Sequence, residues 1–263
     1  MVVTYTIASG KGGTGKTTLS VNLGTMLAHY GEETYILDAD MGMANISIIL
    51  GLENVPVTLH EVLAGKAHVS EAIYEGPCGV KVIPSGISLQ GFQNANPENL
   101  HDVMKDIINQ CDVLIMDAPA GISRDGVIPL AIADEVILVI NPELSSMVDA
   151  LKTKILTELI GGHIKGAILN RATLEKTELS VHKIEEVLGV KVIGLIPDDP
   201  NVRRSAAYKI PIVVKYPNSP ASVEIKKIAA ELAGVEYKKS DTLSASDDKF
   251  LDRLARSITR RKK

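Results

Sequence analysis

Short apolar segments alternate with longer amphipathic stretches along most of the chain. The apolar segments are five to seven residues long, rich in Val, Ile and Leu, and end near Gly, Pro, Asp or Asn, which predicts strands. They cover residues 2–8, 34–38, 80–84, 113–117, 135–141, 164–170 and 190–196. The amphipathic stretches predict helices at residues 17–30, 97–110, 145–160, 179–188 and 221–233. Strands that are apolar on both faces and alternate with helices predict an α/β fold, in which helices cover both faces of a mostly parallel sheet.

The composition supports one large domain of this kind. The 263 residues are 45% hydrophobic but only 3% aromatic, without Trp, so aliphatic side chains must fill the core. Cys78 and Cys111 form no Cys-x-x-Cys pair, which argues against a zinc ribbon, a disulfide framework and a redox dithiol. No apolar run approaches the ~18 residues that cross a bilayer, and no basic segment precedes an apolar one at the N-terminus. We therefore expect a cytoplasmic protein.

A glycine-rich segment lies between the first predicted strand and the first predicted helix. It matches the phosphate-loop spacing G-x-x-x-x-G-K-[ST] and consists of Gly10, Lys11, Gly12, Gly13, Thr14, Gly15, Lys16, Thr17 and Thr18. Glycines let backbone N–H groups surround phosphate oxygens, and the following helix directs its positive end at them. Lys16 is placed to neutralise β- and γ-phosphate charge, and the Thr17 hydroxyl to ligate Mg²⁺. The segment therefore predicts a nucleotide phosphate site rather than a glycine-rich turn with a chance lysine.

Carboxylates follow two further predicted strands. Asp38 and Asp40 stand at the end of one, and Asp117 ends another. A carboxylate at a strand end beside a phosphate loop can hold Mg²⁺ or orient a water for in-line attack, whereas either one alone would more simply cap a turn. We expect Asp117 to take the metal role and Asp40 to orient or deprotonate water. Because a carboxylate in either place can also belong to the Mg²⁺ shell, the candidate metal ligands are Thr17, Asp40 and Asp117.

The additional lysine of the loop carries a family resemblance. With Lys11 near its start, KGGTGKTT resembles the deviant phosphate loops of the MinD/ParA superfamily of P-loop ATPases. The resemblance implies ATP and Mg²⁺ as cofactors, slow hydrolysis, and a homodimer when ATP is bound, in which Lys11 reaches the partner's phosphates. It makes Lys11, Lys16 and Asp40 the catalytic candidates. Residues 38–45 and 117–122 are similar to the two switch segments of MinD, and DAPAGI is closer to the MinD pattern than to that of plasmid-partition ParA.

Two dipeptides extend the resemblance to the base. In these families an Asn-Arg pair after a late strand and a Pro-Asp pair after the next strand frame the adenine. This chain has Asn170-Arg171 and Pro197-Asp198 at the matching places. The resemblance implies that all four contact the nucleotide, against the alternative that they are ordinary turns at strand ends.

The last residues of the chain differ in charge from the rest. Residues 249–263 carry +6, and because the whole chain carries −4, residues 1–248 carry −10. At about 100° per residue the apolar side chains of this segment fall on one arc and most basic ones opposite, as in an interfacial amphipathic helix. The membrane-facing candidates are Phe250, Leu251, Leu254 and Ile258. We therefore divide the chain into an ATPase domain (1–237), a polar linker (238–248) and a C-terminal amphipathic helix (249–263); a docked helix or a frayed, solvated end is the alternative.

The resemblance implies a peripheral protein on the inner face of the cell membrane. In the MinD branch such a protein places the division site, and its membrane-bound ATP dimer recruits a division inhibitor or meets an activator. A DNA-partition ATPase is a weaker alternative because the −10 body would repel DNA. An iron–sulfur carrier is unsupported without cluster cysteines. A regulatory ATPase of flagellar number shares the same motifs and stays open as an alternative.

Overall fold

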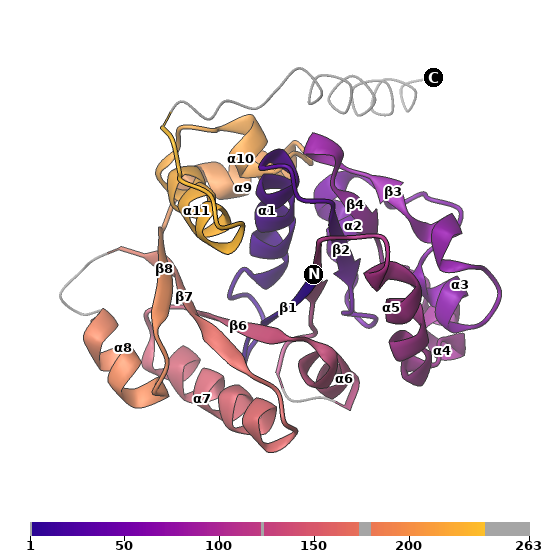
Figure 1. Cartoon of the computed structure of the whole chain (residues 1–263), viewed down its shortest axis with the longest axis horizontal. Coiled ribbons are helices and arrows are strands. Elements are labelled where there is room, and N and C mark those ends of the chain that lie inside the picture. The colour runs from indigo at the N-terminus through magenta and orange to yellow at the C-terminus, as the bar shows by residue number, and fades with distance from the viewer. Residues whose placement is uncertain (1, 122–123, 174–179, 240–263) are drawn as a thin grey trace.

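The computed structural model describes residues 2–121, 124–173 and 180–239. In this part of the chain one eight-stranded sheet forms the centre of the molecule (Figure 1). Its strands are β1 (Val3–Ala8), β2 (Thr34–Asp38), β3 (Tyr74–Glu75), β4 (Lys81–Ile83), β5 (Val113–Asp117), β6 (Glu135–Ile140), β7 (Ile164–Ala172) and β8 (Val192–Pro197). They lie in the order β3-β4-β2-β5-β1-β6-β7-β8, and all pairs are parallel except β3 with β4.

Helices cover both faces of the sheet (Figure 1). They are α1 (Lys16–His29), α2 (Ile46–Leu50), α3 (Leu59–Leu63), α4 (Leu89–Asn94), α5 (Leu100–Ile108), α6 (Arg124–Ile132), α7 (Leu144–Leu159), α8 (Val181–Leu188), α9 (Pro200–Ala207), α10 (Ile212–Lys215) and α11 (Pro220–Leu232). Three 3₁₀ turns, at Val69–Ala72, Pro77–Gly79 and Pro97–Asn99, complete the described elements. The arrangement is the α/β fold with a covered, mostly parallel sheet that the sequence predicts.

Each central strand contributes to two separate cores because its side chains alternate between the faces. Along β5, Leu114 and Met116 belong to the cluster under α5, α7 and α8, whereas Val113 and Ile115 belong to the cluster under α1 and α11. All four side chains are buried. Burial on both faces explains why these strands are continuous apolar runs in the sequence.

The predicted strands all form, and the differences concern short elements. Strand β3 has two residues, and α2, α3, α4 and α10 have four to six, too few to show a period of 3.6. Helix α6 contains Pro129, which argues against a helix interior, so it was not predicted. Helix α9 was not predicted either, although it begins with Pro200, at a position that proline favours. The helix expected at 97–110 is a 3₁₀ turn followed by α5.

The predicted C-terminal helix at 249–263 and most of the linker lie outside the described residues, so the three-part division stays a prediction. Across the described ranges, the helices are too short or too polar for any of them to span a bilayer.

Candidate nucleotide-binding site

The loop between β1 and α1 lies at the carboxyl edge of the sheet, and glycines permit its path. Gly15 has φ +95°, and a Cβ there would stand 2.3 Å from Nδ2 of Asn170. A Cβ on Gly10 would stand 2.2 Å from the backbone carbon of Asp149 in α7. The hydroxyl of Ser9 donates to the carbonyl of Lys11 at 2.7 Å and closes the start of the loop. Larger residues at positions 10 and 15 would therefore displace the loop from its two neighbours.

Lys16 opens α1 and is buried, with 7% of its surface exposed. Burial lowers the pKa of its ammonium group, and the charges of Asp117 and Asp40 partly restore it. The hydroxyl oxygen of Thr14 is also buried and has no hydrogen-bond partner among the described residues. A buried cation and an unpaired hydroxyl in one loop are the groups that phosphate oxygens would satisfy.

Asp117 ends β5 within reach of the first turns of α1. Its carboxylate accepts hydrogen bonds from the hydroxyls of Ser20, at 2.9 Å, and Thr17. Burial, with a smaller contribution from the charge of Asp40, raises the pKa of Asp117 to about 6. Asp38 is its partner in the β2–β5 ladder, and burial followed by the nearby charge of Asp117 raises the pKa of Asp38 well above its usual range. Two buried carboxyl groups at one point of the sheet edge are unfavourable without a cation.

Asp40 lies two residues beyond β2, in the loop that leads to α2. Its backbone N–H donates to Oδ1 of Asp38 at 3.2 Å, and its own Oδ1 accepts from the N–H of Met43 at 3.0 Å. Burial raises the pKa of Asp40, while the Met43 hydrogen bond and the charge of Lys16 oppose that rise. The structure therefore brings Asp40, Asp117 and Lys16 together from three separate segments.

Thr17, Asp40 and Asp117 offer a hydroxyl and two carboxylates beside the phosphate loop. These are oxygen donors of the kind that Mg²⁺ prefers, and the hydrogen bond between Thr17 and Asp117 places two of them in contact. In the described ranges no group of three or more His, Cys, Asp or Glu side chains could hold a metal alone. Mg²⁺ in phosphate sites typically takes one or two carboxylates, with phosphate oxygens and water completing the shell. The donor set therefore fits a metal that arrives with a nucleotide.

Lys11 lies at the rim of the loop, apart from the buried Lys16. Its Nζ is 2.8 Å from Oε2 of Glu143 and 3.1 Å from the hydroxyl of Ser145, and 32% of its side chain is exposed. The hydrogen bond and charge of Lys11 lower the pKa of the Glu143 carboxyl. Glu143 was not among the predicted site residues, although Asn141-Pro142-Glu143 directly follow β6 at the carboxyl edge of the sheet.

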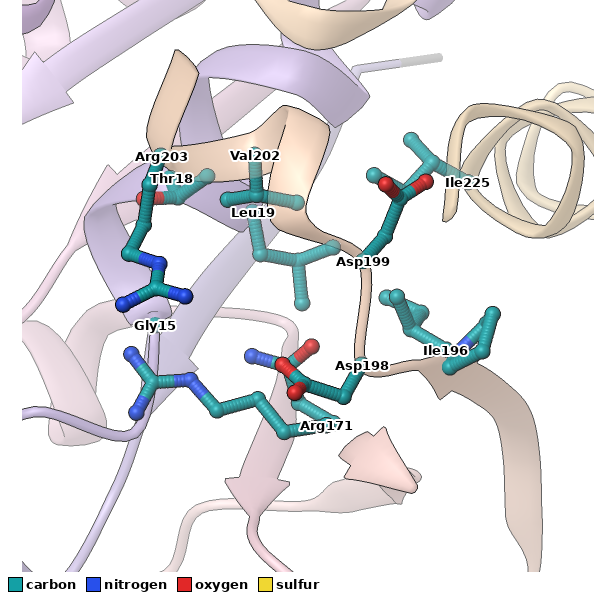
Figure 2. Close-up of a pocket in the computed structure, with 12 residues that line it drawn as sticks. Gly15, Thr18, Leu19, Arg171, Ile196, Asp198, Asp199, Val202, Arg203 and Ile225 are labelled. Atoms are coloured by element: carbon teal, nitrogen blue, oxygen red, sulfur yellow. The ribbon is translucent and has the colours of Figure 1, made fainter. Parts of the chain in front are cut away.

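A cavity of about 320 Å³ opens beside the loop, between β7, β8 and α9 (Figure 2). Its lining comprises Gly15, Thr18, Leu19, Asn170, Arg171, Ile196, Pro197, Asp198, Asp199, Val202, Arg203 and Ile225. Nδ2 of Asn170 donates to the carbonyl of Thr14 at 2.7 Å, which joins the cavity to the phosphate loop. In the view of Figure 2 the guanidinium groups of Arg171 and Arg203 lie on either side of Gly15.

All four residues that the resemblance implied for the base line this cavity, and their contact with adenine stays a prediction. Sequence reasoning missed Arg203 and Val202 because it did not predict α9. The sequence Asp199-Pro200 could have indicated that helix, since Asp199 caps it and proline favours the first helical position.

Comparison with known proteins decides the family. The model of the CobQ/CobB/MinD/ParA nucleotide binding domain matches residues 5–212, which include the phosphate loop, both carboxylate-bearing strand ends and most of the cavity. The chain is a P-loop ATPase of the MinD/ParA family. Solved MinD structures share the fold of this ATPase: that of Pyrococcus furiosus is 35% identical with a TM-score of 0.85, over 89% of this chain and 99% of that one.

Further relatives of this MinD/ParA ATPase cover nearly its whole length. An uncharacterised ATP-binding protein of Methanocaldococcus jannaschii is 49% identical over 98% of this chain and 97% of the relative. The septum site-determining protein MinD of Synechocystis is 32% identical over 96% and 97%, respectively. The MinD of Pyrococcus horikoshii, solved with Mg-ADP, is 34% identical with a TM-score of 0.84, over 88% of this chain and 96% of that one.

Proposed function

We propose that the chain is an ATP-dependent dimerisation switch, in which ATP with Mg²⁺ favours the dimer and slow hydrolysis returns the monomer. The observation that carries this proposal is the separation of the two loop lysines. Lys16 is buried beside Asp117 and Asp40, where it can compensate phosphate charge within its own chain. Lys11 is partly exposed, and among the described residues Glu143 and Ser145 hold it at the rim, from where it can reach phosphates outside its own chain.

The two lysines solve different electrostatic problems. A single bound nucleotide needs one cation for its β- and γ-phosphates, and Lys16 occupies that position. If two copies face each other across their phosphate loops, the γ-phosphates approach and repel unless further positive charge lies between them. Lys11 of each copy would supply that charge to the other copy, as an arginine finger does in other P-loop enzymes.

The remaining site residues have roles that follow from their positions. Thr17 and Asp117 would hold Mg²⁺, which supplies charge neutralisation at the phosphates when bound. Asp40 lies beyond them on a loop, where it would orient the attacking water and accept its proton. The Mg-ADP bound by the Pyrococcus horikoshii MinD supports the use of Mg²⁺ together with an adenine nucleotide.

The cavity would hold the adenine and ribose of the nucleotide. The bond from Nδ2 of Asn170 to the carbonyl of Thr14 fixes the side-chain amide and leaves its amide oxygen free of that contact, so we propose that this oxygen accepts from the base. Adenine presents an amine donor at the position where guanine presents a carbonyl acceptor. Selection of ATP over GTP is the expected consequence.

The cellular role that we propose is placement of the division site. The ATP dimer would bind anionic membrane through residues 249–263, with Phe250, Leu251, Leu254 and Ile258 inserted, and would be peripheral on the inner face of the cell membrane. It would recruit a division inhibitor or meet an activator. A MinC:MinD complex of Aquifex aeolicus supports a protein partner of this kind; its matching chain is 31% identical, with a TM-score of 0.80, over 90% of this chain and 98% of that one.

A second candidate role is regulation of flagellar number. The antiactivator FleN of Pseudomonas aeruginosa is 31% identical over 86% of this chain and 84% of the relative, close to the values for MinD proteins. Such a regulator would use the same switch with a different protein partner. DNA partition is disfavoured by the charge of −10 on residues 1–248.

Sedimentation with ADP or ATP tests the switch through Lys11→Ala. The variant should bind ATP with nearly unchanged affinity, because Lys11 is at the rim, but should stay monomeric with ATP while the wild type dimerises. Lys105→Ala, which removes an exposed lysine of a surface ion pair on α5, is the matched control and should dimerise normally. An ATP dimer of unchanged affinity in Lys11→Ala would contradict the role across the interface.

A further inference from the structure

A buried histidine holds the loop that carries Asp40. His60, in α3, has 1% of its surface exposed, and its Nε2 lies 3.1 Å from the carbonyl oxygen of Met41. Met41 directly follows Asp40. The same Nε2 lies 3.2 Å from the hydroxyl of Ser85, in the loop after β4. One ring nitrogen thus joins α3 to two loops at the carboxyl edge of the sheet.

The surroundings of the ring fix its position. A Cβ on Gly86 would lie 2.5 Å from Nδ1 of His60, and a Cβ on Gly91 would lie 2.9 Å from it. The ring of Phe92 lies beside the imidazole, with the two ring centroids 6.3 Å apart and the rings tilted by 54°. The absence of side chains at positions 86 and 91 therefore lets the backbone close against the imidazole and leaves it little room to turn.

The hydrogen-bonding atoms determine which nitrogen carries the proton. The carbonyl of Met41 can only accept, so Nε2 must donate to it. In a neutral imidazole Nδ1 then carries no proton, and among the described residues Nδ1 has no hydrogen-bond partner. The ring therefore acts as a donor toward the Asp40 loop.

The loop folds inward at the residue that His60 holds. Met41 is buried, with 4% exposed, whereas Met43 is 74% exposed two residues later. The bonds of Asp38 to the N–H groups of Asp40 and Ile46 connect this loop back to the end of β2. The bond from His60 adds an anchor from outside that segment, next to the carboxylate proposed to orient water.

We propose that His60 is a positioning residue for ATP hydrolysis, which sets the place of the Asp40 carboxylate by holding the carbonyl of Met41. The inference rests on the proposed role of Asp40 in hydrolysis. His60 does not line the cavity beside the phosphate loop, so its loss should change turnover rather than nucleotide binding. A displacement of about 1 Å at a catalytic group can cost roughly 100-fold in rate, so a loosened loop is sufficient for a measurable effect.

The experiment compares His60→Leu, His60→Gln and Ser85→Ala with the wild type. His60→Leu removes the donor and should lower kcat roughly 10- to 100-fold with an unchanged Kd for ATP. His60→Gln offers an amide N–H in place of the imidazole and should recover most of the rate. Ser85→Ala, the matched control, removes the other partner of Nε2 but keeps the Met41 bond, and should hydrolyse at close to the wild-type rate. Amide hydrogen exchange over residues 41–46 should quicken in His60→Leu alone.

Gly91→Ala keeps the result decisive if His60→Leu does not fold. Its added Cβ should push the ring away from Met41 and reduce kcat in the same direction. Normal kcat and normal exchange in folded His60→Leu, or in Gly91→Ala if the leucine variant does not fold, would overturn the inference. A fall in kcat that His60→Gln does not recover and that Ser85→Ala shares would also overturn it, because it would indicate a general packing role. Failure of the wild type to hydrolyse ATP would instead overturn the proposed function, while the exchange measurement would still test the anchor.

Discussion

The buried carboxyl pair at the ends of β2 and β5 should make the nucleotide-free protein more stable as the pH falls toward 5.5. Asp38 and Asp117 are both fully buried, and burial is the largest cause of the raised pKa of each. The perturbation is a change from pH 7.5 to pH 5.5 with Mg²⁺ and nucleotide removed by a chelator. Asp117→Asn serves as the comparison because it keeps an oxygen to accept from Ser20 but cannot ionise.

The sign follows from proton binding. With a pKa of about 6 in the folded protein, against 3.8 for an ordinary aspartate, Asp117 binds more protons when folded than when unfolded throughout this window. The free energy of unfolding therefore rises as the pH falls through 6, the opposite of a salt-bridged carboxylate. Integration of proton binding between pH 7.5 and 5.5 gives about 1 kcal/mol for Asp117, and Asp38 acts in the same direction.

Urea denaturation of wild type and Asp117→Asn at the two pH values measures this difference. Other groups that titrate in this window do so in both proteins, so the difference in pH dependence isolates the ionisation of Asp117 together with its coupling to Asp38. The substitution also removes the charge of Asp117 beside Lys16, which changes the absolute stability of the variant. The comparison therefore uses only the change in the free energy of unfolding between the two pH values. The wild type should gain about 1 kcal/mol more than the variant on going to pH 5.5. Equal pH dependence, or a relative loss in the wild type, would refute the reasoning from burial.

Three further predictions concern the phosphate site and the C-terminal segment. Lys16→Ala should lose productive ATP binding, because buried phosphate charge would lack its cation; unchanged affinity by calorimetry would refute the phosphate site. Phe250→Asp should lose most binding to anionic vesicles in co-sedimentation and keep its ATP affinity. ATP should strengthen vesicle binding of the unmodified chain, since two weak tails on one dimer raise avidity by about 10² or more; equal lipid binding by a form ending at Lys239 would refute the anchor.

The strands and the phosphate loop could be predicted from the sequence because local patterns determine them. Residues 113–117 are apolar on both faces and end in Asp117, so both the strand and its carboxylate were recognisable. The glycines and Lys16 have the fixed spacing of a phosphate loop, and this spacing predicts a phosphate site when it lies between a strand and a helix. These features depend on neighbours in the sequence, or on the general rule that ligands bind at the carboxyl edge of a parallel sheet.

The missed features depend on contacts between distant segments. Glu143 meets Lys11 across 132 positions, and the link from His60 to Met41 needs α3, a five-residue helix without a visible period. Arg203 reaches the cavity from α9, whose place beside the phosphate loop follows from the packing of the last strands. Pair contacts of this kind leave no spacing rule in the chain that could have indicated them.

Hydrolysis by Asp40→Ala tests the central claim most directly, because it separates binding, dimerisation and chemistry in one protein. Single-turnover assays with labelled ATP would follow product formation, and sedimentation of the same samples would follow the dimer. The account predicts that the variant binds ATP and forms the dimer but releases no phosphate on the time scale of wild-type turnover. Phosphate release at the wild-type rate would contradict the assignment of Asp40 and, with it, the proposed mechanism of the switch.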